Sequence, residues 1–153
     1  MEPMSAGELR VIRQFLGLSA DQLGALLGVA GRSVRRWESS ERDEHGAVRW
    51  PIPDGIRQAV ERLEDAAATE VGAMVRYLRE MPDPGIVTFR TDAEMAAAHP
   101  GTRLPASWHR AIVGRAIQEV PAVRVAFLSD ALDAGATVQD VLMVAEPAQA
   151  SLR

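Results

Sequence analysis

Cysteine is absent from the 153-residue sequence, and so is lysine. Without cysteine the chain can form no disulfide and offers no thiolate for catalysis or metal binding. No apolar run approaches the roughly 18 residues that predict a membrane-spanning helix. The first ten residues also lack a basic stretch followed by an apolar one, so we expect no secretory signal. These absences predict a cytoplasmic protein that makes no membrane contact.

All 17 basic residues are arginine, so each cationic contact has the planar, forked geometry of a guanidinium group. The formal net charge is −4, but the charge is unevenly distributed along the chain. No carboxylate lies between Asp21 and Glu38, whereas Arg32, Arg35 and Arg36 fall within five residues of one another. This small acidic protein therefore contains one short cationic segment, residues 32–36, whose role is considered below.

The N-terminal segment is predicted to form short helices separated by glycine turns. Ser5 with Glu8, and Ser19 with Gln22, have the spacing of capping boxes, in which each side chain bonds the other residue's backbone amide. Leucines follow each box at helical spacing, and Gly28 ends the second helix. A third helix is expected over 31–38, which gives helix-turn-helix spacing.

The rest of the chain predicts one long helix followed by a small α/β module. Apolar residues recur every three or four positions between about residues 54 and 80, which indicates one long helix or two stacked ones. Beyond Gly85 we predict a strand (86–90), two helices (92–99 and 104–120) and a second strand (122–128). A short helix carrying Val138, Val141 and Leu142 should follow. The expected fold is mainly α with a small α+β part: a DNA-binding domain (1–65), a connecting helix (66–84) and a β-α-α-β module (85–153).

Placed on a helix, the cationic segment separates into two faces. Val34 and Trp37 fall on one side, and the three arginines fall on the other. A helix that enters the DNA major groove needs this arrangement, because its inner face must stay fixed to the neighbouring helices. Guanidinium groups can bond guanine bidentately or clamp phosphate. The alternative is a solvated face whose arginines pair with Glu38, Glu41 and Asp43.

Two further features would fit a DNA interface. Backbone amides at the helix start near Ser19 could receive a phosphate. Gly31 has no side chain and would allow close approach to the DNA. Metal, cofactor and catalytic patterns are weak by comparison: the three histidines show no metal-ligand spacing, and Ser107 and His109 point in different directions on a helix. We therefore predict no enzyme, no cofactor and no metal site.

The stretch LSADQLGALLGVAGRSVRRWESS resembles the Cro/repressor (XRE) helix-turn-helix family. The resemblance rests on Leu23, Leu27-Gly28-Val29, Val34 and Trp37-Glu38. It implies an N-terminal domain of the five-helix type, in which Arg32 and Arg36 read bases while Ser33 and Arg35 lie beside the backbone or bases. Ala20 replaces a glutamine that is common in the family, and Ala30 replaces a serine or threonine that usually caps the recognition helix.

The C-terminal part is similar to the YdiL-like group, which includes anti-CRISPR-associated autorepressors, through its LPASWHRA element and the following strand. This resemblance implies a dimerisation module and repression of a nearby promoter. Pairing of two copies would also cover the edges of a two-stranded sheet. The residues predicted to lie in or beside the dimer core are Trp108, Ile112, Val123, Val125 and Phe127.

The sequence therefore predicts a homodimeric transcriptional repressor that binds double-stranded DNA at an inverted-repeat operator through helix 31–38. Two other functions stay open. The chain could be an antitoxin whose C-terminal module binds a toxin protein, or a regulator with a ligand pocket between the long helix and the α/β module.

Overall fold

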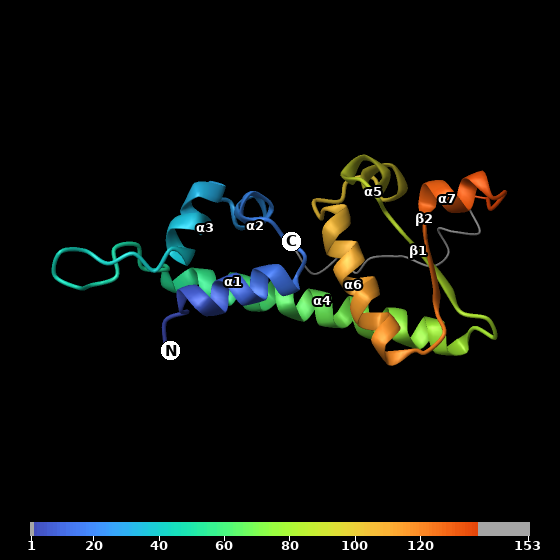
Figure 1. Cartoon of the computed structure of the whole chain (residues 1–153), viewed down its shortest axis with the longest axis horizontal. Helices are drawn as coiled ribbons and strands as arrows, with labels where there is room; N and C mark the ends of the chain where they lie inside the picture. The colour runs from blue at the N-terminus through green and yellow to red at the C-terminus, as the bar shows by residue number, and fades with distance from the viewer. Residues whose placement is uncertain (1, 138–153) are drawn as a thin grey trace. The chain divides into compact units, whose positions relative to one another are not determined.

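The computed structural model describes residues 2–137, which are mainly helical with one small parallel sheet (Figure 1). The chain forms two compact units that divide between Glu64 and Asp65, inside a long helix. The expectation of a mainly helical fold with a small mixed part is confirmed. The predicted helix that carries Val138, Val141 and Leu142 lies outside the described residues.

Three short helices open the first unit: α1 (Ala6–Phe15), α2 (Ala20–Leu27) and α3 (Gly31–Glu38). Both predicted capping boxes are present, and each satisfies two amides at a helix start. Leu9, Leu23 and Val34 give one fully buried side chain from each helix to the core of this unit. The first turns of α4 (Asp54–Glu80) complete it with Val60 and Leu63.

This unit does not contain five helices. Residues 39–53, between α3 and α4, form no helix; they hold an isolated antiparallel bridge between Arg42 and Val48 instead. Asp43 closes the turn of this hairpin, because its carboxylate accepts hydrogen bonds from the amides of His45 and Ala47. In Figure 1 the hairpin extends away from the three helices of its unit.

The second unit has the predicted β-α-α-β order and an additional short helix. Strand β1 (Gly85–Thr88) pairs in parallel with β2 (Arg124–Phe127), in a register that places Ile86 opposite Val125. The crossover contains α5 (Asp92–Ala98) and α6 (Ala106–Glu119), and α7 (Leu128–Asp133) follows β2. The second strand begins two residues later than predicted because Ala122 has a φ of 63°, which a strand cannot accommodate.

The core of the second unit lies around α6 and the second half of α4. Trp108 and Ile112 of α6 are buried together with Val71 and Leu78 of α4. The Trp108 indole Nε1 donates a 3.0 Å hydrogen bond to the Glu70 carboxylate, so the polar atom of this buried ring is satisfied. Burial raises the pKa of Glu70, while the indole bond opposes that rise. Ile117 of α6 lies outside this core and is exposed.

Candidate nucleic-acid interface

Helices α2 and α3 are joined by a three-residue turn that needs glycine at its start. Gly28 ends α2 in the left-handed conformation, with a φ of 73° that residues with a side chain rarely adopt. Ala30 stands at the N-cap position before α3 and makes no side-chain capping bond, because its side chain is a methyl group. The N-terminus of α3 is therefore left without a side-chain cap.

Two further glycines let α2 and α3 approach closely, and sequence reasoning missed their role. A Cβ atom on Gly24 would lie 2.7 Å from the Val29 carbonyl oxygen and 2.9 Å from the Gly31 nitrogen. A Cβ atom on Gly31 would lie 2.8 Å from the Asp21 Cα atom. Real Cβ atoms do not approach backbone atoms so closely. The packing of α3 against α2 therefore requires glycine at position 31, and this requirement is separate from the predicted approach to DNA.

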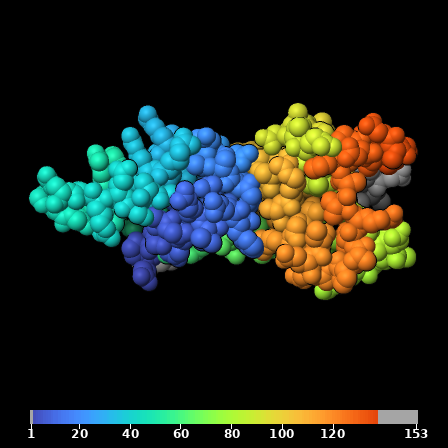
Figure 2. Space-filling model, viewed as in Figure 1, coloured from blue at the N-terminus to red at the C-terminus, as the bar shows by residue number. Residues whose placement is uncertain are grey.

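Helix α3 has the two faces that the sequence predicts. Val34 is fully buried, and the side chains of Arg32, Arg35 and Arg36 are exposed. Trp37 is only half-buried, not buried as predicted, because it lies in the last turn of α3 beside the departing loop. Ser33 is also half-buried. Figure 2 shows the segment from α3 through the hairpin, light blue to cyan, at the surface of this unit.

The carboxylates proposed as alternative partners of these arginines are engaged elsewhere. Glu38 bonds Arg13 of α1, and Glu41 lies 3.6 Å from Arg49. Asp43 accepts the backbone amides of the hairpin turn. The solvated-face alternative therefore loses the three partners that it requires.

Each of the three arginines has a different environment. Arg35 forms an exposed 3.0 Å ion pair with Asp21 of α2. The Arg36 guanidinium lies over the Trp50 ring, 4.6 Å from its centroid. Within the described residues, Arg32 has no hydrogen-bond or ion-pair partner. Arg32 and Arg36 thus keep their N–H donors available to a ligand, whereas Arg35 has one donor committed.

The start of α2 offers fewer free amides than the sequence predicts. The Ser19 hydroxyl accepts the Gln22 amide at 3.1 Å, and the Gln22 side chain accepts the Ser19 amide at 2.8 Å. A phosphate at this helix end would meet two amides that already have partners. Ser19 is exposed, but its hydroxyl caps α2 in this structure.

The residues predicted for a dimer interface separate into two groups. Trp108 and Ile112 are buried in the core of the second unit, and their predicted place in or beside a dimer core stays a prediction. They are buried because α6 packs this face onto its own unit. Strand β2 differs: Val125 is 43 % exposed, and Val123 and Phe127 are half-buried. Arg90 lies over the Phe127 ring at 4.3 Å.

A buried polar cluster fills the space beside β1. Thr88 Oγ1 lies 2.8 Å from His109 Nδ1, and the Phe89 ring packs against both His109 and His99. Burial is the main cause that lowers the pKa of His109 to about 4, and the nearby His99 and Arg110 contribute to the same shift. His109 is therefore neutral near pH 7 and acts as a core residue.

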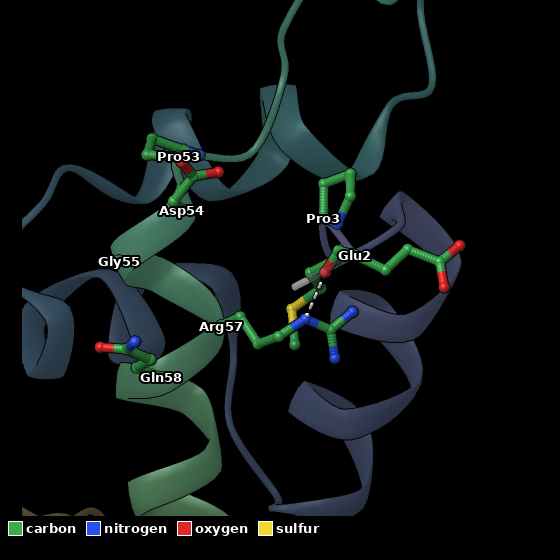
Figure 3. A pocket seen from close by; sticks show the side chains of 8 residues that line it. Glu2, Pro3, Pro53, Asp54, Gly55, Arg57 and Gln58 are labelled. Carbon is green, nitrogen blue, oxygen red and sulfur yellow. Dashed lines mark hydrogen bonds between the residues drawn. The ribbon is translucent and has the colours of Figure 1, made fainter.

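Neither a metal site nor a membrane span is found in residues 2–137. No group of three or more His, Asp or Glu side chains there could hold a metal ion. No helix in the same range is both long and apolar enough to cross a bilayer. A pocket of about 300 Å³ lies where α4 begins, and Figure 3 shows Arg57 reaching from α4 to the Glu2 carbonyl oxygen, 3.0 Å away. The α3 arginines do not line it.

Comparison with models of known protein families gives no match, and comparison with curated proteins gives none either. The function is therefore inferred from the geometry of α2, α3 and the hairpin.

Proposed function

We propose that the chain is a sequence-specific DNA-binding regulator in which α2 and α3 act as a helix-turn-helix of the Cro/repressor kind. In this proposal α3 enters the major groove, and Arg32 and Arg36 contact base edges. Ser33 and Arg35 lie beside the DNA backbone or bases. Such a protein needs no cofactor and no catalytic residue.

The observation that carries the proposal is the division of α3 into a buried face and a donor-rich face. Val34 fixes the helix in the core, so the opposite side must face outward. That side holds three exposed guanidinium groups, two of which have no carboxylate partner among residues 2–137. A bidentate arginine–guanine contact is worth about 1–3 kcal/mol of discrimination against the wrong base.

The acidic net charge does not oppose this function. The Debye length is about 8 Å at physiological ionic strength, so carboxylates farther than that are largely screened from the groove. Asp21 is the carboxylate that pairs with an α3 arginine, and it lowers the positive charge of this face. We therefore expect modest non-specific affinity and a strong dependence of binding on the base sequence.

We propose that the protein binds as a homodimer and represses a nearby promoter, with the promoter of its own gene among the candidates. A single recognition helix buries little surface, whereas two copies can read half-sites about one helical turn apart. Strand β2 supplies a surface for pairing, since it hydrogen bonds only β1 among the described strands and its side chains are largely exposed. The twofold axis would make the operator an inverted repeat.

Selection of bound sites from random duplex DNA tests this function. We expect the full-length protein to enrich an inverted repeat whose half-sites are spaced by about one helical turn. Failure to enrich any sequence over the input library would refute sequence-specific binding. Enrichment of a single, unrepeated half-site would retain DNA binding and refute the dimer.

An antitoxin is the second candidate, although the observation that favours it lies on α1 and not on the C-terminal module that the sequence predicts to bind the toxin. Val11 and Phe15 lie one helical turn apart and are 66 % and 55 % exposed, which makes an apolar patch that a second protein could cover. Co-expression with the product of the adjacent gene separates the candidates. An antitoxin should co-purify with it as a stable complex, and a Val11→Asp variant should lose the complex while still binding DNA.

A further inference from the structure

We infer that Trp50 is a positioning residue for DNA recognition, because its indole holds the Arg36 guanidinium in place with the N–H edges free. This inference rests on the proposed function and assigns the hairpin a role in it. The hairpin that carries Trp50 to α3 would thereby determine which conformation of Arg36 the DNA meets.

The geometry brings two guanidinium groups to one indole. The Arg36 Cζ atom lies 4.6 Å from the Trp50 ring centroid, and the Arg49 Cζ atom lies 5.4 Å from it. Both distances fall within the range of cation–π attraction. Arg36 comes from the last turn of α3 and Trp50 from the far end of the hairpin, so the stack joins two segments 14 positions apart.

The hairpin holds Trp50 in place through its own backbone. Arg42 bridges Val48, and the Arg49 amide donates a 2.8 Å hydrogen bond to the Glu41 carbonyl oxygen. Buried Ile52 anchors the chain two residues after Trp50. These contacts fix both ends of the segment, so the indole position does not depend on Arg36 alone.

Stacking and ion pairing have opposite consequences for DNA binding. An ion pair uses the N–H donors of a guanidinium group, as Arg35 does with Asp21. Stacking uses the flat face and leaves all donors in the plane free. Arg36 is therefore restrained without losing the paired N–H groups that guanine O6 and N7 or a phosphate require.

The charges around the Trp50 ring also leave the Arg36 guanidinium available to an anionic ligand. Arg36 and Arg49 place two positive charges near one ring, and Glu41, 3.6 Å from Arg49, compensates one of them. The stacked Arg36 has no carboxylate partner in the described part of the chain, so its charge is available to an anionic ligand. DNA is the ligand of that chemistry in the proposed function.

The test is a double-mutant cycle on the full chain, with the dissociation constant measured by fluorescence anisotropy on the duplex that the wild type selects. Trp50→Ala should weaken binding about 3- to 10-fold, because the Arg36 side chain would then have to be ordered when DNA binds. Trp50→Phe keeps an aromatic face and should stay within about twofold of the wild type. In an Arg36→Ala background, Trp50→Ala should add less than about twofold.

Two controls separate positioning from folding. Trp50→Leu retains apolar volume without an aromatic face, so it should weaken binding as much as Trp50→Ala does. If the alanine variant does not fold, the leucine variant still tests the stack. Arg62→Ala removes an exposed arginine of α4 in the same unit and measures the effect of general charge loss.

Three outcomes would overturn the inference. Losses from Trp50→Ala and Arg36→Ala that add fully in the double variant would show that Trp50 acts without Arg36. Wild-type affinity in both Trp50→Ala and Trp50→Leu would show that the stack does not matter, with the proposed function intact. A wild type that binds no duplex would refute the proposed function and this inference together.

Discussion

Arg13 of α1 and Glu38 of α3 form a two-pronged ion pair. Arg13 Nε lies 2.6 Å from Glu38 Oε1, and Arg13 Nη2 lies 2.8 Å from Oε2. The third guanidinium nitrogen, Nη1, donates to the Leu18 carbonyl oxygen at 2.8 Å. The pair fastens the end of α3 to α1 and keeps the Glu38 carboxylate away from the α3 arginines. The cationic face of α3 therefore depends on an arginine in another helix.

Glu38→Ala should lower the free energy of unfolding by about 3 kcal/mol, because it leaves the Arg13 guanidinium poorly solvated and without its partner. The Arg13 and Glu38 side chains are only 12 % and 5 % exposed, so solvent screens the pair little. Arg10→Ala is the matched control, since Arg10 lies 3.7 Å from the same carboxylate but is exposed. Its cost should stay below about 1 kcal/mol. Equal costs in urea denaturation would contradict this account of the pair.

Gly24→Ala should destabilise the fold by about 1–3 kcal/mol, as overpacking does elsewhere in protein cores. The added methyl group would meet the backbone of the turn at 2.7 Å, and that backbone cannot move without displacing α3. Gly55→Ala in α4 is the control, because nothing lies within 4 Å of its Cβ position. We expect it to be neutral or stabilising, since alanine favours a helix. A melting temperature that is unchanged in Gly24→Ala would contradict the close packing of α2 and α3.

The local features of the first unit could be predicted from the sequence because they depend on residues close together in the chain. The two capping boxes, the Gly28 turn and the Val34 face each follow from spacings of a few residues. The Arg13–Glu38 pair and the Arg36–Trp50 stack could not be predicted, because they join residues 25 and 14 positions apart. The glycines at positions 24 and 31 are visible in the sequence, but a glycine does not show which neighbouring backbone packs against it.

The second unit shows a different limit. The β-α-α-β order follows from local patterns, whereas the sequence does not show that Trp108 and Ile112 are already buried within their own unit. The sequence alone cannot distinguish an apolar residue covered by its own chain from one covered by a second copy. Only the packing of α6 distinguishes the two, and that packing involves residues far away in the chain, such as Glu70 of α4, which lies 38 positions before Trp108.

Asp21→Asn should tighten DNA binding about threefold at low salt, because it removes the negative charge that pairs with Arg35. The amide keeps the shape of the carboxylate next to Gly31, so the contact between α2 and α3 is preserved. Anisotropy titrations at several salt concentrations measure the effect. Weaker binding in this variant would contradict the placement of Arg35 at the interface.

Acidification should destabilise the wild type more than a His109→Gln variant. The folded-state pKa of His109 is about 4 and its unfolded value is near 6.5, so only the unfolded chain takes up this proton between those values. Stability from this group is full above about pH 6.5 and falls as the pH drops towards 4. Between pH 7 and pH 5 the wild type should lose about 2 kcal/mol more than the variant.

Urea denaturation at the two pH values measures this difference. His99 is present in both proteins, so its contribution to the pH dependence cancels. The glutamine can still bond Thr88, so the variant keeps a polar partner at that position. A variant that loses as much stability as the wild type would show that His109 is not held neutral by burial.

The most direct test of the central claim repeats the selection of duplex DNA with Arg32→Ala and with the control Arg62→Ala. Arg32 lies on the exposed face of α3 without an ion-pair partner in the described residues, and Arg62 is an exposed arginine of α4. We predict that Arg62→Ala recovers the wild-type site, whereas Arg32→Ala loses base preference at one position in each half-site. Recovery of the unchanged wild-type site by Arg32→Ala would contradict the assignment of α3 as the helix that reads DNA.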